Sequence, residues 1–309
     1  MFSADSGNGL RRVGEISNLE MNLPLAHDRR FLYHSCMITP LLQHREGPVL
    51  VLTLNDPDRA NPLSGPLVDA LHRALVDAAG NDQVRAVVLT GAGRHFSAGA
   101  DLSALESLAS GGSDAENRTD SDRLERMFEQ LLGYPGLTLA AVHGAAMAGG
   151  CGLATACDFV VAERSARFAY PEVKIGFVAA LVSTFLTRRV AGHVARRMLL
   201  DPQVLDGSTA VELGLADRLV EDGTALEEAR ELAISILRKA SPSAIAATKK
   251  LLNDTVGMGW RDALMVASGV NVRQRRDPDC RRGVRSFLDT KTTPDWLDTA
   301  DDEGNSTEP

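Results

Sequence analysis

Two glycine-rich stretches decide the fold of this chain: Phe96-Ser97-Ala98-Gly99-Ala100-Asp101-Leu102 and Ala148-Gly149-Gly150-Cys151-Gly152-Leu153-Ala154. Each follows a short apolar run typical of a buried strand, Ala86-Val87-Val88-Leu89 for the first and Leu139-Ala140-Ala141-Val142 for the second, and each opens a helical pattern. A turn from strand to helix leaves backbone N–H groups free at the start of the helix. Two such turns brought together would form an oxyanion hole, a pair of donors that stabilises a carbonyl oxygen as it gains negative charge.

Three ordered motifs carry a resemblance to a known family. They read LTGAGRHFSAGADL at 89–102, AAVHGAAMAGGCGLATACDFVVA at 140–162 and ARFAYPEVKIGF at 166–177. The chain resembles the enoyl-CoA hydratase/isomerase, or crotonase, superfamily from about Leu50 to Trp296. The resemblance implies an α/β fold in which strand, strand, helix units repeat as a spiral, with sheets packed nearly at right angles. It also implies C-terminal helices that pack against neighbouring subunits and hold them together as a homotrimer or homohexamer.

Composition and charge fit a large globular domain. The 309 residues are 44% hydrophobic and 24% charged, and no apolar stretch reaches the 18 residues of a membrane span. The net charge is −8, and residues 297–309 hold five acidic residues and no basic one. With no basic stripe, the sequence favours neither nucleic acid nor a membrane as a partner.

Periodic segments divide the chain into four parts. We expect a disordered extension at 1–36, a spiral core at 37–190, a helical region at 191–290 and an acidic tail at 291–309. A strand pair at Ile38–Leu42 and 48–54 also suggests a translation start at Met37. Expected helices cover 64–80 with Ser64 as N-cap, a segment from Leu102, 191–200, 226–239, 241–253 with Ser241 as N-cap, and 260–274. A loop at 111–114 interrupts the helical pattern, and Leu124, Met127, Phe128 and Leu131 then form either core or pocket wall.

The candidate chemistry is enolate stabilisation at an acyl thioester. By motif position, the N–H groups of Ala100 and Gly149 match the two donors that hold a thioester oxygen in the family, and Glu172 matches a catalytic glutamate of its hydratases and isomerases. If apolar neighbours such as Phe177 and Val178 enclose Glu172, they would raise its pKa and suit it to proton transfer near neutrality.

At two positions this chain lacks an acidic residue that some members of the family use in catalysis. Classical hydratases of the family carry a second glutamate where this chain has Gly152, and dehalogenases and dienoyl isomerases carry an aspartate where it has Ala180. The resemblance favours an enoyl-CoA hydratase, with a Δ3,Δ2-enoyl-CoA isomerase that uses one glutamate as the alternative. A catalytically silent CoA-binding scaffold is a third reading, which the presence of Glu172 disfavours.

Coenzyme A is part of the expected substrate, so no separate cofactor is expected. By the resemblance, the residues that bind coenzyme A are Arg59, Ala60, Ser97, Ala98, Asp101 and Leu102. Lys291 is expected to contact a phosphate of the coenzyme A bound to a neighbouring subunit. The four cysteines (Cys36, Cys151, Cys157 and Cys280) lack metal-ligand spacing and are expected to be reduced thiols in a cytoplasmic protein, Cys151 and Cys157 within one buried helix. His143 is expected to shape its loop, and His95 to lie at the surface.

Overall fold

The computed structural model describes residues 39–298. The expected extension at 1–36 and the proposed start at Met37 lie outside these residues. No helix in the described part of the chain is both long and apolar enough to cross a membrane.

A six-stranded sheet forms the centre of the described residues, in the order β1-β2-β4-β6-β8-β11. The chain runs antiparallel between β1 and β2, and every later pair in this sheet is parallel. The strands are β1 (Leu41–Glu46), β2 (Val49–Leu54), β4 (Ala86–Gly91), β6 (Leu137–Val142), β8 (Phe159–Glu163) and β11 (Arg218–Val220). Because β11 pairs with β8, the sheet continues past residue 190, the expected end of the spiral core.

Short strands form a second layer that carries the glycine turns. They are β3 (Pro62–Leu63), β5 (Gly99–Ala100), β7 (Ala145–Met147), β9 (Arg167–Ala169) and β10 (Leu205–Asp206). β3 pairs with β5, and β9 lies between β10 and β7. A single bridge between Ser97 and Ala146 joins these two groups of strands.

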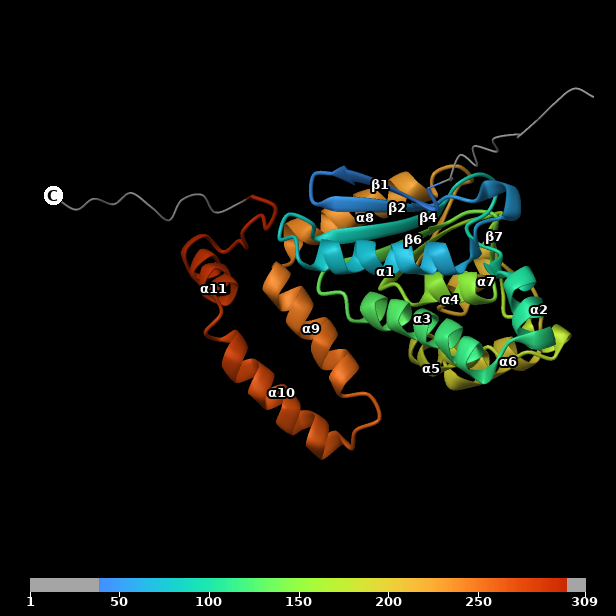
Figure 1. Cartoon of the computed structure of the whole chain (residues 1–309). Coiled ribbons are helices and arrows are strands. Elements are labelled where there is room, and N and C mark those ends of the chain that lie inside the picture. Colours follow the sequence, from blue (N-terminus) through green and yellow to red (C-terminus); the bar gives the residue numbers. More distant parts are fainter. Residues whose placement is uncertain (1–38, 299–309) are drawn as a thin grey trace, which may run out of the picture. The chain divides into compact units, whose positions relative to one another are not determined.

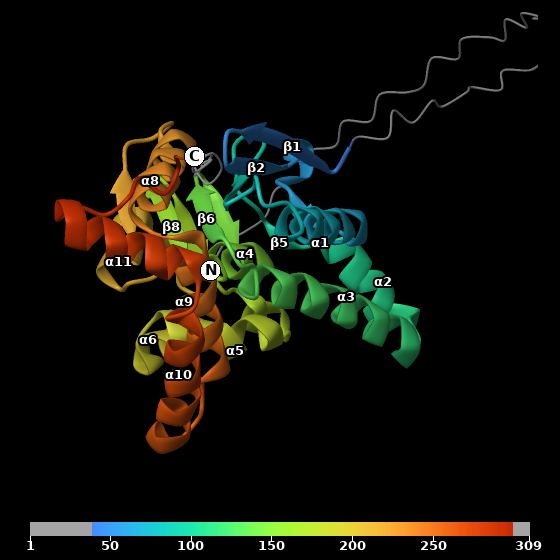
Figure 2. The same cartoon turned by 90° about the vertical axis from the view of Figure 1, so that its left-hand side faces the viewer.

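Helices cover both faces of the large sheet (Figures 1 and 2). They are α1 (Gly65–Ala79), α2 (Leu102–Gly111), α3 (Asp114–Leu132), α4 (Gly149–Thr155), α5 (Ala180–Arg189), α6 (Gly192–Leu200), α7 (Gly207–Glu212), α8 (Ala225–Lys239), α9 (Pro242–Asp254), α10 (Trp260–Gln274) and α11 (Pro278–Thr290), with short 3-10 turns η1 (Pro57–Arg59) and η2 (Glu172–Ile175). Figure 2 shows α8 on one side of β6 and β8, with α1, α3 and α4 on the other side.

Alternate residues of the parallel strands enter two separate cores. Val88 of β4 and Leu139 of β6 pack with α8, whereas Leu89 of β4 and Ala140 of β6 pack into the larger cluster that includes α1 and α3. Successive side chains of a strand point to opposite faces, so a strand buried on both faces needs a continuous apolar run. This explains the all-apolar runs that the sequence shows at 86–89 and 139–142.

The structure confirms the predicted α/β class and the helical C-terminal region. The first strand is the main shift: β1 covers Leu41–Glu46 rather than Ile38–Leu42, because it pairs residue by residue with β2 as an edge strand whose residues 42–46 are exposed. Ser64 stands at the predicted N-cap of α1 without a side-chain cap bond, whereas Ser241 Oγ accepts a hydrogen bond from the Ala244 N–H.

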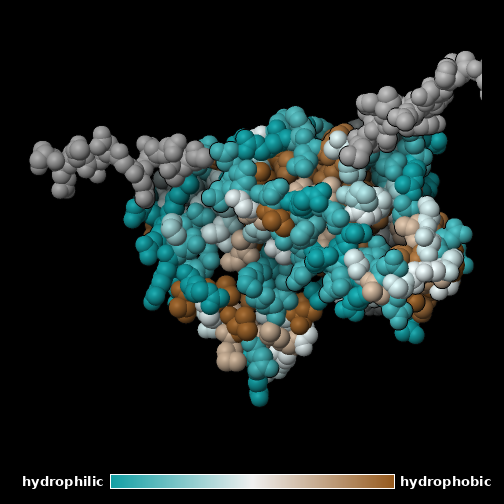
Figure 3. All heavy atoms as spheres, viewed as in Figure 1, coloured by the Kyte–Doolittle hydropathy of each residue, from teal (hydrophilic) through white to brown (hydrophobic). Residues whose placement is uncertain are grey.

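The C-terminal helices expose apolar side chains. α10 makes its main contacts with α9, and Trp260, Leu264 and Met265 on α10 are each at least 60% exposed. Figure 3 shows apolar residues gathered on the face formed by α9 and α10. Beyond α11, the described start of the predicted tail turns back to the fold, where the buried Trp296 donates its N–H to Arg238 O at 3.0 Å.

Candidate active site

The first glycine turn is tied by its backbone to two other parts of the second layer. The Ser97 N–H donates to Ala145 O at 3.0 Å, and the Ala98 N–H donates to Ala60 O at 2.7 Å. Gly99 has a φ of +89°, in the left-handed region that is costly for a residue with a Cβ. The turn therefore requires glycine at 99 for its conformation as well as for its contacts.

The second glycine turn ends at the start of α4. Ala148, the residue before this helix, has φ +51° and ψ −127° and donates its N–H to Ala169 O at 2.9 Å. Such strained backbone in a non-glycine residue persists where surrounding contacts hold it in place. Gly149 opens α4, and its N–H has no hydrogen-bond acceptor among the residues that the structure describes. A free N–H at this position points out of the helix and can donate a hydrogen bond to a ligand's oxygen.

The two glycine turns touch each other. A Cβ on Gly99 would stand 2.4 Å from Met147 O and 3.1 Å from the nitrogen of Gly149. A Cβ on Gly150 would stand 2.5 Å from Ser97 O. Both glycines are thus needed for close approach of one backbone to the other, and the approach brings the peptides that carry the Ala100 and Gly149 N–H groups to the same place.

Asn61 holds the turns in this arrangement, and the sequence analysis did not single it out. The buried side-chain amide of Asn61 donates to Ala92 O at 2.9 Å and to His95 O at 2.8 Å. The backbone carbonyl of Asn61 accepts a hydrogen bond from Ser97 Oγ at 2.8 Å. Asn61 has a φ of +54°. Asparagine is enriched in this region of φ, so the Ala60-Asn61-Pro62 sequence held a signal for a special turn.

Glu172 lies beside the second turn because β9 leads directly to it. The Ala148 N–H bonds to Ala169, the last residue of β9, and Glu172 follows three residues later at the start of η2. Its side chain is buried, at 8% exposure, and its Oε2 atom has no hydrogen-bond partner among residues 39–298. Burial raises the pKa of Glu172 above its ordinary value, although a hydrogen bond from its own backbone opposes part of that rise.

Phe177 and Val178, the neighbours expected to enclose Glu172, are themselves 47% and 67% exposed. Phe177 contacts Glu172 through its backbone N–H, which donates to Glu172 O at 3.0 Å. Burial raises the pKa of the Cys151 thiol to about 12, and the nearby Glu172 carboxylate adds to that rise. Cys151 is the third residue of α4, so the charge of Glu172 acts on the helix that follows the second glycine turn.

The place beside Gly152 is filled by an apolar side chain. A Cβ on Gly152 would stand 2.2 Å from Cγ1 of Val182 and 3.6 Å from Cζ of Phe128. Val182 belongs to α5 and Phe128 to α3, and both are buried. Phe128 is thus core and also part of the wall beside α4. No carboxylate could stand at position 152 unless Val182 moved.

Most of the predicted CoA-binding residues gather at one edge of the first turn. Arg59, at the end of η1, pairs with Asp101 at 2.7 Å and with Asp56 at 3.5 Å, and its side chain is 49% exposed. The hydrogen bond from Arg59 lowers the pKa of Asp101, which also caps α2 through the N–H groups of Ser103 and Ala104. Ala98 and Leu102 are exposed nearby in the chain.

Two predicted binding residues differ from this group. The side chain of Ser97 is fully buried. Its Oγ donates to Asn61 O and accepts from the Gly99 N–H at 3.2 Å, so it stabilises the turn from the interior of the fold. Lys291 ends α11 and donates to Leu288 O. Figures 1 and 2 both show α11 on the opposite side of the sheet assembly from α2, so one chain does not bring Lys291 to Arg59.

The histidines and cysteines serve the structure. His143 lies 3.2 Å from Gly93 O, as expected for a residue that shapes its loop, whereas His95 is half-buried rather than at the surface because its Nδ1 accepts from the Ala145 N–H. Cys151 and Cys157 are buried and free. α4 ends at Thr155, so Cys157 follows the helix where the chain turns toward β8; Cys36 lies outside the described residues.

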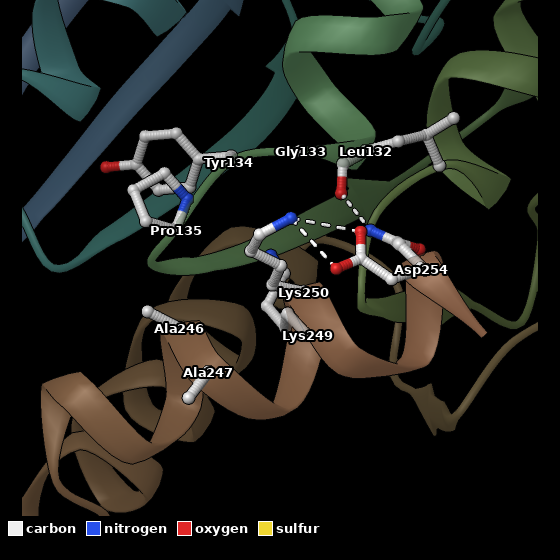
Figure 4. A pocket seen from close by; sticks show the side chains of 10 residues that line it. Leu132, Gly133, Tyr134, Pro135, Ala246, Ala247, Lys249, Lys250 and Asp254 are labelled. Carbon is white, nitrogen blue, oxygen red and sulfur yellow. Dashed lines mark hydrogen bonds and ion pairs between the residues drawn. The ribbon is translucent and has the colours of Figure 1, made fainter. Parts of the chain in front are cut away.

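A cavity of about 370 Å³ lies apart from the glycine turns, between the loop after α3 and helix α9 (Figure 4). None of the predicted site residues lines it, and its charged groups are paired: Lys250 with Asp254, and Lys249 with Asp158 outside the lining. Within residues 39–298, no group of three or more His, Cys, Asp or Glu side chains could hold a metal ion.

Comparisons with known proteins agree with the geometry. A family model described as enoyl-CoA hydratase/isomerase matches residues 44–299. A putative enoyl-CoA hydratase of Thermus thermophilus is 45% identical over 251 residues, covering 81% of this chain and 98% of that protein. A 2,3-dehydroadipyl-CoA hydratase of Escherichia coli is 31% identical, covering 84% and 99%. The crystal structure of an enoyl-CoA hydratase from Mycobacterium smegmatis has a TM-score of 0.76 at 31% identity, covering 83% of this chain and 98% of that one.

Proposed function

Because the chain belongs to the enoyl-CoA hydratase/isomerase family, we propose that it is an enoyl-CoA hydratase, a lyase that adds water to a 2-enoyl-CoA. The observation that carries this proposal is the contact between the two glycine turns beside a buried carboxylate. Gly99 lies against the nitrogen of Gly149, and Glu172 follows the strand that binds Ala148. The names of the relatives support hydration over the other reactions of the family.

The oxyanion hole would consist of the Ala100 and Gly149 N–H groups. The thioester oxygen accepts both hydrogen bonds and becomes negative when electrons of the C2=C3 double bond move toward the carbonyl. Preorganised donors of this kind lower the barrier by about 3 kcal/mol each. The donors need no reorganisation free energy during the reaction, because Asn61 and the contact between the turns already hold them in place.

Glu172 would move the proton. Its carboxylate takes a proton from water as the water oxygen bonds to C3, the electron pair passes to the thioester oxygen, and Glu172 returns the proton to C2 as the carbonyl re-forms. The unpartnered Oε2 and the raised pKa support this role, because a carboxyl group with a pKa nearer to neutral accepts and releases protons more readily. Since coenzyme A belongs to the substrate, the reaction needs no separate cofactor.

One observation favours a second candidate, the Δ3,Δ2-enoyl-CoA isomerase. Val182 fills the place beside Gly152, so the position where two-glutamate relatives carry their second carboxylate is apolar here. A single carboxylate suffices to carry a proton from C2 to C4, whereas hydration also requires that the same group position a water molecule.

The test offers the enzyme crotonyl-CoA and, separately, 3-hexenoyl-CoA. A hydratase removes the conjugated enoyl absorbance of the first, and an isomerase creates that absorbance from the second. In D2O, hydration should add one deuterium at C2, whereas an isomerase returns much of the substrate's own proton. We expect hydration, slower than in a two-glutamate enzyme; a change with 3-hexenoyl-CoA alone would replace hydratase with isomerase.

The assembly and the location belong to the same proposal. We propose a homotrimer or homohexamer, because α10 and α11 present large apolar side chains, among them Trp260, Met265 and Leu288, that are at least 60% exposed in one chain. Lys291 could then meet the site of a neighbouring copy. The free thiols Cys151, Cys157 and Cys280 support a cytoplasmic location.

A further inference from the structure

Position 152 stands next to the proposed oxyanion donor. It lies three residues after Gly149 on α4, so both belong to the first turn of this helix. A Cβ in a helix leans toward the N-terminus, and a side chain at 152 would therefore lean toward the end where the Gly149 N–H is free. Because residue 152 is glycine, whatever fills that space comes from elsewhere in the fold.

Val182 of α5 fills it. Its Cγ1 and Cβ lie 2.2 Å and 3.2 Å from the position that a Cβ of Gly152 would take. Val182 is 4% exposed, and Phe128 lies beside it at Gly152. The ring of Phe128 packs in turn against the ring of Phe185, with 5.2 Å between the two ring centroids. A valine is branched at Cβ and stiff at χ1. Together with its burial, this favours one orientation of the Val182 methyl groups beside Gly152.

Glu172 approaches the same helix turn from β9: the last residue of that strand, Ala169, accepts the N–H of Ala148, the residue directly before Gly149. An acyl group whose thioester oxygen binds the Gly149 N–H therefore lies near both the carboxylate of Glu172 and the methyl groups of Val182. The carboxylate acts on protons, and the valine meets the carbon atoms of the acyl group.

We propose that Val182 determines which acyl groups the site accepts, by limiting the size of the substituents on C2 and C3. This inference rests on the proposed function, because it needs the thioester at the Gly149 N–H. A linear enoyl group fits beside the valine methyls, and a methyl branch at C2 or C3 collides with them. A side chain held in one orientation discriminates by exclusion, and one methyl group then changes kcat/KM by roughly tenfold or more.

The experiment compares the wild type with Val182→Ala and Val182→Ile on a linear and two branched thioesters: crotonyl-CoA, 2-methylcrotonyl-CoA and 3-methylcrotonyl-CoA. We expect Val182→Ala to raise the ratio of kcat/KM for a branched over the linear substrate by about tenfold, and Val182→Ile to lower it. The matched control is Val88→Ala, a fully buried valine in the core on the α8 side of the sheet, which should leave the ratio unchanged.

An unchanged ratio in an active Val182→Ala protein would overturn the inference, since Val182 would then serve only the packing of α5 on α4. Failure of the proposed function looks different: the wild type would turn over none of the enoyl thioesters. Calorimetric binding of butyryl-CoA and 2-methylbutyryl-CoA to the same variants then tests the wall without turnover. A shift of the Kd ratio toward the branched ligand in Val182→Ala supports the inference, and an unchanged ratio or no binding refutes it.

Discussion

The contact between Gly152 and Val182 makes a quantitative prediction for stability. A Cβ at 152 would stand 2.2 Å from Val182 Cγ1, although carbon atoms pack best at about 3.5–4.0 Å. Gly152→Ala should therefore destabilise the protein by about 1–3 kcal/mol through overpacking. Val182→Ala removes two buried methyl groups and should cost about 2 kcal/mol. In the double variant the added methyl group enters the space that the valine leaves, so the two costs should not add.

Urea unfolding of the four proteins at one protein concentration measures this cycle. We expect a coupling energy of about 1–3 kcal/mol, with the double variant more stable than the sum of the single changes. The matched control pairs Gly152→Ala with Val88→Ala, two positions in separate cores, which should add within about 0.5 kcal/mol. Additivity within that same limit for Gly152 and Val182 would refute the close approach of α5 to α4.

Three further predictions concern the site. Gly149→Pro removes the proposed donor N–H and should lower turnover by roughly a hundredfold or more, whereas Gly149→Ala keeps the N–H; equal rates for the two folded variants would contradict the oxyanion assignment. Because burial raises the pKa of Glu172, the folded state holds its proton to a higher pH than the unfolded state does, so stability falls as pH rises from the ordinary glutamate pKa through the raised one. Glu172→Gln lacks this loss, and urea titrations from pH 4 to 8 should show the variant gaining on the wild type as pH rises; a constant difference would argue against a raised pKa. Arg59→Ala should raise KM for a CoA thioester by about tenfold, the usual cost of one charged hydrogen bond, and leave KM for a pantetheine thioester unchanged. An equal effect on both substrates would show that Arg59 does not bind the nucleotide part of coenzyme A.

Local signals in the sequence predicted the elements that depend on neighbouring residues. Ser241 followed by Pro242 marked the start of α9, and a break within the predicted loop at 111–114 separates α2 from α3 at Gly112 and Ser113. The apolar runs of β4 and β6 are continuous because both faces of the sheet are covered. These features follow from capping, glycine conformation and strand periodicity, which act over a few residues.

The arrangement of the site depends on contacts between distant residues, which the sequence alone could not give. Phe177 and Val178, which were expected to be buried around Glu172, are 47% and 67% exposed, because the direction of a loop is set by the elements on which it packs. The role of Asn61 depends on carbonyls 31 to 35 residues away. β11 lies within the region predicted to be helical, at 191–290, and forms a strand because it pairs with β8.

The central claim is that Glu172 carries the proton at a thioester held by the two turns. The direct measurement is kcat/KM of Glu172→Gln against wild type on whichever of crotonyl-CoA or 3-hexenoyl-CoA the wild type turns over. Glutamine keeps the size of the side chain and removes its ability to exchange a proton, so the rate should fall by about 10²–10⁴ or below detection while the fold is retained. A Glu172→Gln protein that keeps a near-normal rate on that substrate would show that another group moves the proton.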